Sequence, residues 1–375
     1  MLKVSIIFGT RPEAIKMAMI IKEFEKRPNI DLNVCFTGQH KEMVLPLINF
    51  FGLTIHYSLD LMRTNQSLAG LTSKSIEAID EYLEKVKPDL VIVQGDTTTA
   101  MSAATAAFYR KIKIGHVEAG LRTHDINSPF PEEFNRVTIS KVADFHFAPT
   151  KQSLQNLIQE KVNTSSIFVT GNTVIDALLF TKEKIGNHIS DFLKTEYPWL
   201  RKRKPFILIT GHRRENFGTG FENMCFAIKE LAEKFKQFDF IYPVHLNPNV
   251  QKPVKDILSD EDNIYLILPL DYINFTSLLS NCYFVLTDSG GVQEEAPSFG
   301  KPVLVMRDNT ERQEAITAGV ALLVGTDKEK IVSEASRLIE DKEFYKKMSY
   351  TENPFGLGNS AEKIVEIISN NFSRS

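Results

Sequence analysis

Residues 286–300 have the sequence LTDSGGVQEEAPSFG, which is typical of a β-strand, a glycine turn and a helix in succession. The apolar residues 283–287 suit a buried strand of a parallel sheet. Gly290 and Gly291 let the backbone approach a ligand closely, and the first N–H groups of the helix favour an anion such as a phosphate. Ser289 adds a hydroxyl donor, and Glu295 offers an acceptor for the hydroxyls of a ribose. The stretch predicts a nucleotide diphosphate site, and an ordinary strand-to-helix turn explains it about as well.

The same alternation of strand, polar turn and helix recurs along the whole chain. Apolar strands are predicted in the first half at 4–8, 32–37, 90–94, 112–117, 142–149 and 167–170, and in the second half at 206–210, 238–244, 263–268 and 302–306. Helical periodicity lies between them, for example at 14–24, 65–86 and 221–235. This pattern predicts an α/β fold with parallel sheets.

The length of 375 residues suits two domains. The turns after the two opening strands, GTRPE at 9–13 and GHRRE at 211–215, share the order glycine, arginine, glutamate, which favours two similarly built halves. We expect an N-terminal domain over residues 1–175, to which a C-terminal helix at 360–375 returns, and a second domain over 176–359. The charged, aperiodic segment 186–205 suits a connection between domains.

Composition excludes several classes of protein. Hydrophobic residues make up 43% and charged residues 24%, as in a soluble globular protein, and the net charge of -3 gives no general attraction to nucleic acid or an anionic membrane. The three cysteines are odd in number and lie in apolar segments, so buried thiols in a reducing compartment are expected. The apolar run at 4–8 is too short for a signal peptide or a membrane span. The sequence therefore predicts a cytoplasmic protein.

The sequence also predicts that no metal or cofactor takes part. None of the eight histidines forms a spaced pair with a cysteine or a second histidine, which argues against a zinc site. No G-x-G-x-x-G follows either opening strand, so the usual signature of a nicotinamide cofactor is missing.

Three carboxylates follow predicted turns in the first half of the chain. Asp96 comes after the strand at 90–94, Glu118 follows the strand at 112–117, and Glu132 stands in the first turn of a helix after Pro131. Helix capping by Asp96 and the helix dipole at Glu132 and the adjacent Glu133 would explain these positions without any function. Three acids at one edge of one α/β unit nevertheless favour a carboxylate site. At the first turn of the chain, Pro12 suits the start of a helix and is expected to leave Arg11 on the loop before it.

Further motifs accompany these: GTRPEAIK (9–16), GQH (38–40), GDTTT (95–99), HVEAGLRT (116–123), PEE (131–133), GNT (171–173) and HRREN (212–216). With the stretch at 286–300, they give the chain a close resemblance, from end to end, to the non-hydrolysing UDP-N-acetylglucosamine 2-epimerases. The resemblance implies two Rossmann-like domains with a cleft between them, as in the GT-B glycosyltransferases, and usually a homodimer. It also implies interconversion of UDP-GlcNAc and UDP-ManNAc for bacterial surface polysaccharides.

The family's functional residues match positions in this sequence. The resemblance implies catalytic roles for Asp96, Glu118, Glu132 and His212, and contacts with UDP or the sugar for Arg11, Lys16, His212, Phe275, Ser289, Gly290, Gly291, Glu295 and Arg312. A second, activating UDP-GlcNAc bound by some members implies a possible allosteric set of Gln39, Glu42, Gln66 and His245. Glu42 and Asn65 depart from the residues typical of regulated members, which leaves activation open. Gln313 replaces the usual proline, which predicts a softer loop around Arg312.

The implied reaction is an elimination of UDP followed by its re-addition. Three other functions remain open. A hydrolysing epimerase would release free ManNAc, but its opening turn tends to have Ala-Asp where this chain has Pro12-Glu13. A GT-B glycosyltransferase would leave the additional cleft acids unexplained. A nucleotide-sugar sensor without activity would tolerate the loss of those acids, which are all present.

Overall fold

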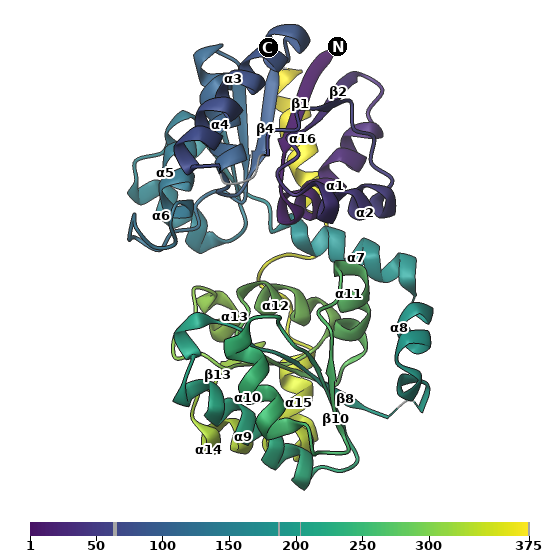
Figure 1. Cartoon of the computed structure of the whole chain (residues 1–375). Helices are drawn as coiled ribbons and strands as arrows, with labels where there is room; N and C mark the ends of the chain where they lie inside the picture. The colour runs from purple at the N-terminus through teal and green to yellow at the C-terminus, as the bar shows by residue number, and fades with distance from the viewer. Residues whose placement is uncertain (63–65, 187, 203, 374–375) are drawn as a thin grey trace. The chain divides into compact units, whose positions relative to one another are not determined.

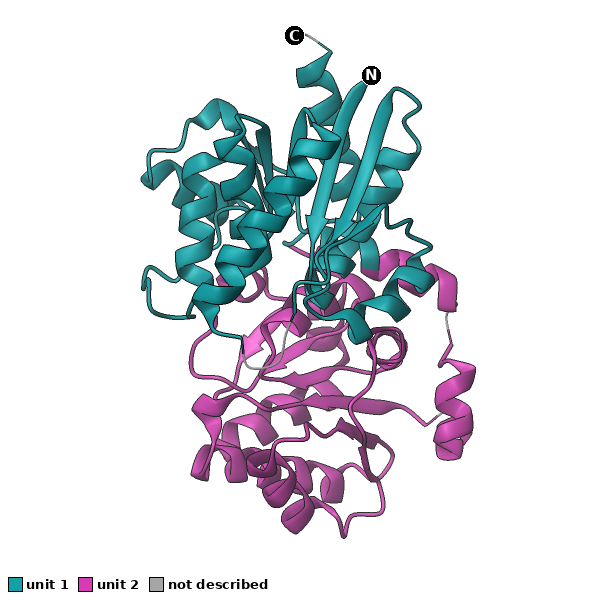
Figure 2. Ribbon diagram, turned by 45° about the horizontal axis from the view of Figure 1, so that its top comes forward, with its two compact units in different colours: residues 1–177, 355–375 teal, residues 178–354 magenta. Residues whose placement is uncertain are grey.

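The computed structural model describes residues 1–62, 66–186, 188–202 and 204–373 (Figure 1). The chain divides into two compact units, which Figure 2 shows in different colours. Unit 1 comprises Met1–Ala177 and Phe355–Ser375, and unit 2 comprises Leu178–Pro354. Each unit has its own parallel sheet and is described by itself.

Unit 1 is built on a seven-stranded parallel sheet in the order β3-β2-β1-β4-β5-β6-β7. The strand order reverses between β1 and β4, and in such sheets ligands bind beyond the carboxyl ends of the strands at this point. The strands are β1 (Leu2–Phe8), β2 (Ile30–Phe36), β3 (Tyr57–Ser58), β4 (Leu90–Gln94), β5 (Lys113–Val117), β6 (Phe145–Ala148) and β7 (Ile167–Val169).

Helices cover the sheet of unit 1 because its central strands are apolar on both faces, as β4 shows with five buried residues in succession. Helices α3, α4 and α5 pack on one another over a core that includes Ile7, Val91 and Ile114. The last helix, α16, packs against α1, beside which Figure 1 shows it in yellow. The helices are α1 (Arg11–Glu25), α2 (Lys41–Phe51), α3 (Leu68–Val86), α4 (Thr98–Tyr109), α5 (Glu132–Val142), α6 (Lys151–Gln159), η1 (Thr164–Ser166), α7 (Thr173–Ile185), which continues into unit 2, and α16 (Ser360–Phe372).

Unit 2 repeats this architecture with a six-stranded parallel sheet in the order β10-β9-β8-β11-β12-β13. Its reversal point lies between β8 and β11. The strands are β8 (Phe206–Thr210), β9 (Asp239–Pro243), β10 (Ile264–Ile267), β11 (Val285–Thr287), β12 (Val303–Val305) and β13 (Ala321–Leu323).

The helices of unit 2 are α8 (Asp191–Glu196), η2 (Pro198–Lys202), η3 (Arg214–Asn216), α9 (Thr219–Lys234), α10 (Pro248–Leu258), α11 (Tyr272–Asn281), α12 (Gly290–Glu295), η4 (Ala296–Phe299), α13 (Gln313–Ala318), α14 (Lys328–Glu340) and α15 (Lys342–Ser349). Of these, α9, α10, α14 and α15 contribute to a large core that includes Phe221, Phe240 and Tyr242. Across the part of the chain that the structure describes, no helix has both the length and the apolar character to span a membrane.

The predicted α/β class with two Rossmann-like units and parallel sheets is confirmed. The interpretation of 186–205 as an aperiodic connection is wrong, since its described residues include α8 and η2 and belong to unit 2. The hydroxyl of Ser190 accepts a hydrogen bond from the Leu193 N–H and so caps α8, a signal that the high charge of the segment obscured.

Candidate functional site

Glu118 lies directly after β5, at the carboxyl edge of the sheet of unit 1. Its φ of 63° is in the left-handed region, which is uncommon for a residue with a side chain. The carboxylate is buried and accepts hydrogen bonds from Lys16 Nζ at 2.6 and 2.7 Å, Asn172 Nδ2 at 3.3 Å and Gln94 Nε2. A strained backbone that holds a buried carboxylate against a lysine is a feature of functional sites. Of these partners, the sequence analysis identified only Lys16.

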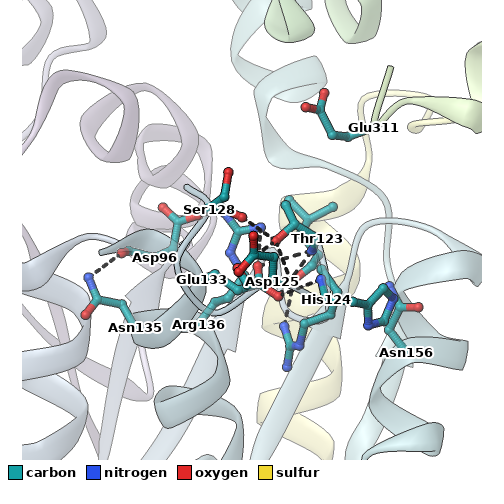
Figure 3. Close-up of polar contacts among 12 residues, drawn as sticks. Asp96, Thr123, His124, Asp125, Ser128, Glu133, Asn135, Arg136, Asn156 and Glu311 are labelled. Atoms are coloured by element: carbon teal, nitrogen blue, oxygen red, sulfur yellow. Dashed lines mark hydrogen bonds and ion pairs between the residues drawn. The ribbon is translucent and has the colours of Figure 1, made fainter. Parts of the chain in front are cut away.

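Asp96 lies after β4, next to β5 in the sheet. It precedes Thr97, whose hydroxyl caps α4, so helix capping does not explain the aspartate. The Arg136 guanidinium pairs with its carboxylate, and Asn135 Nδ2 donates to its backbone carbonyl at 2.8 Å (Figure 3). Burial raises the pKa of Asp96; the charge of Arg136 opposes this rise, and the charge of Glu118 adds to it. A carboxyl group with a raised pKa is suited to proton transfer near neutral pH.

The two neighbouring glutamates at the start of α5 differ in their surroundings. Glu133 is buried, accepts hydrogen bonds from the backbone N–H groups of Thr123 and His124, and pairs with Arg136 at 3.3 Å. Figure 3 shows it holding the loop before α5. Glu132 is partly exposed, and within the described part of the chain its carboxylate makes no hydrogen bond or ion pair. Glu133 therefore has a structural role, while Glu132 retains a carboxylate that can meet a ligand.

Glu13 joins the loops after β1 and β4, and the sequence analysis did not include it among the site residues. Its buried carboxylate accepts hydrogen bonds from the N–H groups of Gly9 and Thr10 and from the hydroxyls of Thr10 and Thr97, at 2.7 to 3.1 Å. Burial raises the pKa of Glu13, and these hydrogen bonds oppose the rise. The spacing Thr10-x-x-Glu13 is a capping box, the signal that could have identified it.

The capping box also moves the start of α1. Thr10 is the N-cap and Arg11 the first helical residue, so the expectation that Arg11 lies on the loop is wrong by one position. Its side chain is exposed, and its charge, together with the larger effect of burial, lowers the pKa of His40. Arg11 and His40 therefore lie close enough at this edge for their charges to interact.

The residues predicted for a second ligand are dispersed over several elements. Gln39 Oε1 accepts a hydrogen bond from Thr99 Oγ1 at 3.0 Å, and Glu42 is exposed in the first turn of α2. Gln66 precedes the N-cap of α3 and is partly buried, and Asn65 lies outside the described residues. His245 follows β9 in unit 2 and is exposed.

In unit 2, His212 follows β8 at the reversal point of the sheet. The carboxylate of Asp288, after β11, accepts hydrogen bonds from the backbone N–H groups of His212 at 2.8 Å and Arg213 at 2.7 Å. The His212 ring stacks on the ring of His245, with centroids 5.0 Å apart. Burial lowers the pKa of His212, and the charge of Asp288 opposes this effect. The loops after β8, β9 and β11 thus meet around His212.

The glycine turn begins α12, which has six residues before η4 follows. A Cβ atom at Gly290 would lie 3.1 Å from the guanidinium carbon of Arg312, so this glycine allows the arginine to pack against the turn. Arg312 Nε in turn donates to Glu294 Oε1 at 2.9 Å. The remaining predicted residues of this region, Phe275 in α11 and Ser289, Gly291 and Glu295 around α12, are partly or fully exposed.

Gln313, the expected departure from the family pattern, closes the loop before α13. Its amide donates to the carbonyl of Thr310 at 2.8 Å, and the hydroxyl of Thr310 donates to Gln293 Oε1 at 2.6 Å. The backbone N–H of Arg312 donates to the same hydroxyl at 3.1 Å. Side-chain hydrogen bonds therefore hold the loop around Arg312.

Comparisons with known proteins agree with the geometry of both units. Residues 22–369 match the family model described as UDP-N-acetylglucosamine 2-epimerase. A UDP-N-acetylglucosamine 2-epimerase of Campylobacter jejuni is 52% identical over 98% of this chain and 97% of the relative.

Solved structures give the same result. The crystal structure of a UDP-GlcNAc 2-epimerase of Neisseria meningitidis bound to UDP-GlcNAc has 48% identity and a TM-score of 0.88, with 98% of this chain and 100% of that chain covered. The Methanocaldococcus jannaschii enzyme in complex with UDP-GlcNAc and UDP has 36% identity and a TM-score of 0.78, with the same coverage. This chain therefore belongs to the UDP-N-acetylglucosamine 2-epimerase family.

Proposed function

We propose that this chain interconverts UDP-GlcNAc and UDP-ManNAc by inverting the configuration at C2 of the sugar. The observation that supports this most is the pair of acids Asp96 and Glu118 at neighbouring strand ends of unit 1. Asp96 has a raised pKa, and Glu118 is held by Lys16. The relatives bound to UDP-GlcNAc and UDP support the choice of substrate.

We propose that the reaction proceeds by elimination because the C2 hydrogen is not next to a carbonyl group. A carboxylate removes the C2 proton, the electrons of the C–H bond form a C1=C2 double bond, and the electrons of the C1–O bond leave with UDP. A carboxyl group then returns a proton to the opposite face of C2, and UDP adds again at C1. General acid–base groups of this kind typically contribute ~10²–10⁴-fold in rate.

We assign the proton transfers to residues of unit 1 and most of the contacts with the nucleotide to residues of unit 2. Asp96, Glu118 and Glu132 are the proposed acids and bases. The charge that develops on the departing diphosphate is stabilised by Arg11, His212 and the amides of the glycine turn, the electrostatic contribution that is usually largest. Glu295 accepts hydrogen bonds from the ribose, and the other proposed contacts with UDP are Lys16, Phe275, Ser289 and Arg312. No metal or nicotinamide enters any step.

One incubation tests this function. The protein is mixed with UDP-GlcNAc alone in D₂O, and the products are identified by NMR. Epimerisation by elimination predicts UDP-ManNAc with deuterium at C2. Free ManNAc with UDP would indicate a hydrolysing enzyme. An unchanged substrate that nonetheless binds would indicate a glycosyltransferase without its acceptor, or a sensor.

An isotope label separates elimination from transient oxidation of the sugar. If the C1–O bond breaks, ¹⁸O placed in the bridging position should scramble into the non-bridging oxygens of the β-phosphate. His212→Asn holds the diphosphate more weakly, so UDP and the unsaturated sugar should leak into solution during long incubations. Product without C2 deuterium, combined with no leakage, would contradict the mechanism.

Three properties of the working protein are part of the proposal. We propose a homodimer that supplies ManNAc-type precursors for surface polysaccharide, in agreement with the family. We also propose that it works in the cytoplasm, in agreement with its three free, buried cysteines. Activation by a second UDP-GlcNAc at Gln39, Glu42, Gln66 and His245 is the remaining proposal. Light scattering measures the oligomeric state, and a sigmoidal dependence of rate on UDP-GlcNAc would reveal the activation.

A further inference from the structure

Asp288 is the fully buried carboxylate at the reversal point of unit 2. One oxygen, Oδ2, accepts the backbone N–H groups of His212 and Arg213, which belong to the loop after β8. Because these donors stand 76 and 75 residues earlier in the chain, Asp288 fixes one loop of the site from another. These two hydrogen bonds occupy only one of the two oxygens of the Asp288 carboxylate.

The other oxygen, Oδ1, has no hydrogen-bond partner in the described part of the chain. Leaving a buried carboxylate oxygen without a donor is unfavourable, so such an atom calls for a specific explanation. The Nδ1 atom of His212 lies 3.9 Å from it, longer than a hydrogen bond but within the range of an ion pair. Catalytic hydrogen bonds are often long in ligand-free enzymes and shorten when substrate binds.

His245 restrains the same imidazole from a third loop. Its ring lies almost parallel to that of His212, with 11° between the ring planes. The Nδ1 atom of His245 accepts the backbone N–H of Asn247 at 3.1 Å, so the proton of the neutral His245 ring is on Nε2. His245 thus fixes the plane of the His212 ring and leaves Nδ1 of His212 on the side of Asp288.

Three groups adjust the proton affinity of His212 besides its burial. The carboxylate of Asp288 raises the pKa of His212, while His245 and Arg213 act with burial to lower it. Asp288 is the group in this set that favours the imidazolium form. A positively charged ring is also the form best suited to a departing diphosphate.

We propose that Asp288 is the positioning residue of His212: it holds the loop through two amides and accepts the Nδ1–H of the imidazole, so that Nε2 faces the diphosphate. The identity of that ligand rests on the function proposed above. The pairing of Asp288 with His212 is independent of that function, because it is argued from the contacts within unit 2. In the neutral ring the proton is therefore on Nδ1, and Nε2 becomes a donor when the ring takes up a second proton.

The first test is the ¹⁵N NMR spectrum of His212 in the full chain, which distinguishes the two neutral tautomers. We expect the wild-type protein to carry its proton on Nδ1. In Asp288→Asn, the amide oxygen still accepts the two backbone N–H groups, but the amide nitrogen now donates towards the ring. The tautomer should therefore switch to Nε2–H, and the titration midpoint of His212 should fall by at least ~1 pH unit, because a unit charge about 4 Å away is lost.

The matched control is Asp239→Asn. Asp239 is also buried and pairs with Lys204 at 2.7 Å, but it begins β9 and so lies at the opposite edge of the sheet. This variant loses a buried carboxylate without touching His212. We expect its tautomer and titration midpoint to equal those of the wild type.

The second test is the pH dependence of kcat for epimerisation, which reports groups in the enzyme–substrate complex. The high-pH limb should move to lower pH by ~1 unit or more in Asp288→Asn and stay in place in Asp239→Asn. An unchanged limb and an unchanged tautomer would overturn the inference, and so would a wild-type ring protonated on Nε2, even if Asp288→Asn fails to fold. Absence of epimerisation in the wild type would instead refute the proposed function, while the NMR result still decides the role of Asp288.

Discussion

The two units share the same order for their first six strands, and in each a carboxylate links the two loops at the point where the strand order reverses. The carboxylate comes from a different one of these two loops in each unit. In unit 1 the carboxylate of Glu13 follows the first strand and reaches Thr97 after the fourth. In unit 2 Asp288 follows the fourth strand of its unit, β11, and reaches the backbone after the first, β8. The two carboxylates also differ in how many hydrogen bonds their oxygens accept.

Glu13 accepts four hydrogen bonds, whereas one oxygen of Asp288 has no donor in the described part of the chain. The hydrogen bonds that Glu13 accepts all come from the two loops that it joins. Asp288, with an unused oxygen, can still act on its neighbour His212. At the two reversal points, Glu13 therefore holds a loop, whereas Asp288 also has an oxygen available to His212.

The largest effects on turnover are expected from substitutions of the acids of unit 1. They test whether the proton transfers belong to that unit. Asp96→Asn, Glu118→Gln and Glu132→Gln should each lose at least ~10²-fold in kcat, because each removes a proton-transfer group. Asp96→Asn and Glu118→Gln should fold normally because the amide oxygens keep part of the hydrogen bonding, and Glu132→Gln because the Glu132 carboxylate makes no hydrogen bond in the described part of the chain. Near-normal turnover in one variant would remove that acid from the proton-transfer set.

Glu13 tests whether a fully used carboxylate is structural. Glu13→Ala leaves four donors without this acceptor, three of them on the buried Gly9 and Thr10, and should lower the free energy of unfolding by roughly 3 kcal/mol or more. Glu13→Gln keeps one carbonyl oxygen and should lose about half as much. Urea unfolding followed by fluorescence and circular dichroism measures both, and the comparison breaks if Glu13→Ala costs no more than Asp288→Asn.

Asp176 provides a pH-dependent difference in stability between the units. Its carboxylate is buried in unit 1 and accepts the Ala361 N–H at the start of α16 at 2.8 Å; burial raises the pKa of Asp176 to about 6. The native state then binds a proton more tightly than the unfolded chain, whose value is near 3.8. The resulting stability is fully present below pH ~4 and is lost as the pH rises through ~6.

Asp176→Asn should abolish this loss, which we expect to be roughly 2 kcal/mol in the stability of unit 1. Denaturant unfolding at pH 4 and pH 7 measures it, and the transition of unit 2 serves as an internal control. A variant whose unit 1 still loses the same stability between these pH values would show that another group titrates.

The smallest effects concern the nucleotide and sharpen the assignment of UDP to unit 2. Ser289→Ala removes one hydroxyl donor and should weaken UDP binding roughly tenfold, with Glu295→Ala giving a loss of similar size. Glu132→Gln should leave the affinity for UDP largely intact. Calorimetric titration with UDP compares the three, and equal losses would show that the residues of the two units have been assigned wrongly.

The long apolar segments made much of the fold predictable. Strands at 90–94 and 206–210 were predicted with the bounds of β4 and β8, because each is a continuous apolar run before a polar turn. The edge strands β3 and β13, of two and three residues, were not predicted. Their residues are partly or wholly exposed, apart from Ala321, so they carry little of the apolar signal on which the prediction relied.

Residues of the candidate site could be predicted from the sequence only where a carboxylate or another reactive side chain directly follows a predicted strand. Asp96 and Glu118 were proposed in this way, whereas His212 was proposed from the resemblance to the family. The role of Asp288 was not predicted, because it depends on donors from a loop more than 70 residues away. For Glu13 the local capping box with Thr10 could have been recognised, but its link to Thr97, 84 residues away, could not. Likewise, the spacing of Glu132 and Glu133 does not reveal which of the two is occupied by the loop at 123–124.

Because α16 packs on unit 1, the two units become complete at different times during synthesis. Unit 2 is complete once residue 354 has left the ribosome, whereas unit 1 needs residues 355–375, which are made later. Until then the surface of α1 that α16 contacts is uncovered, although most of unit 1 was translated first. Unit 1 therefore completes its fold after unit 2, contrary to the usual N-terminal-first order.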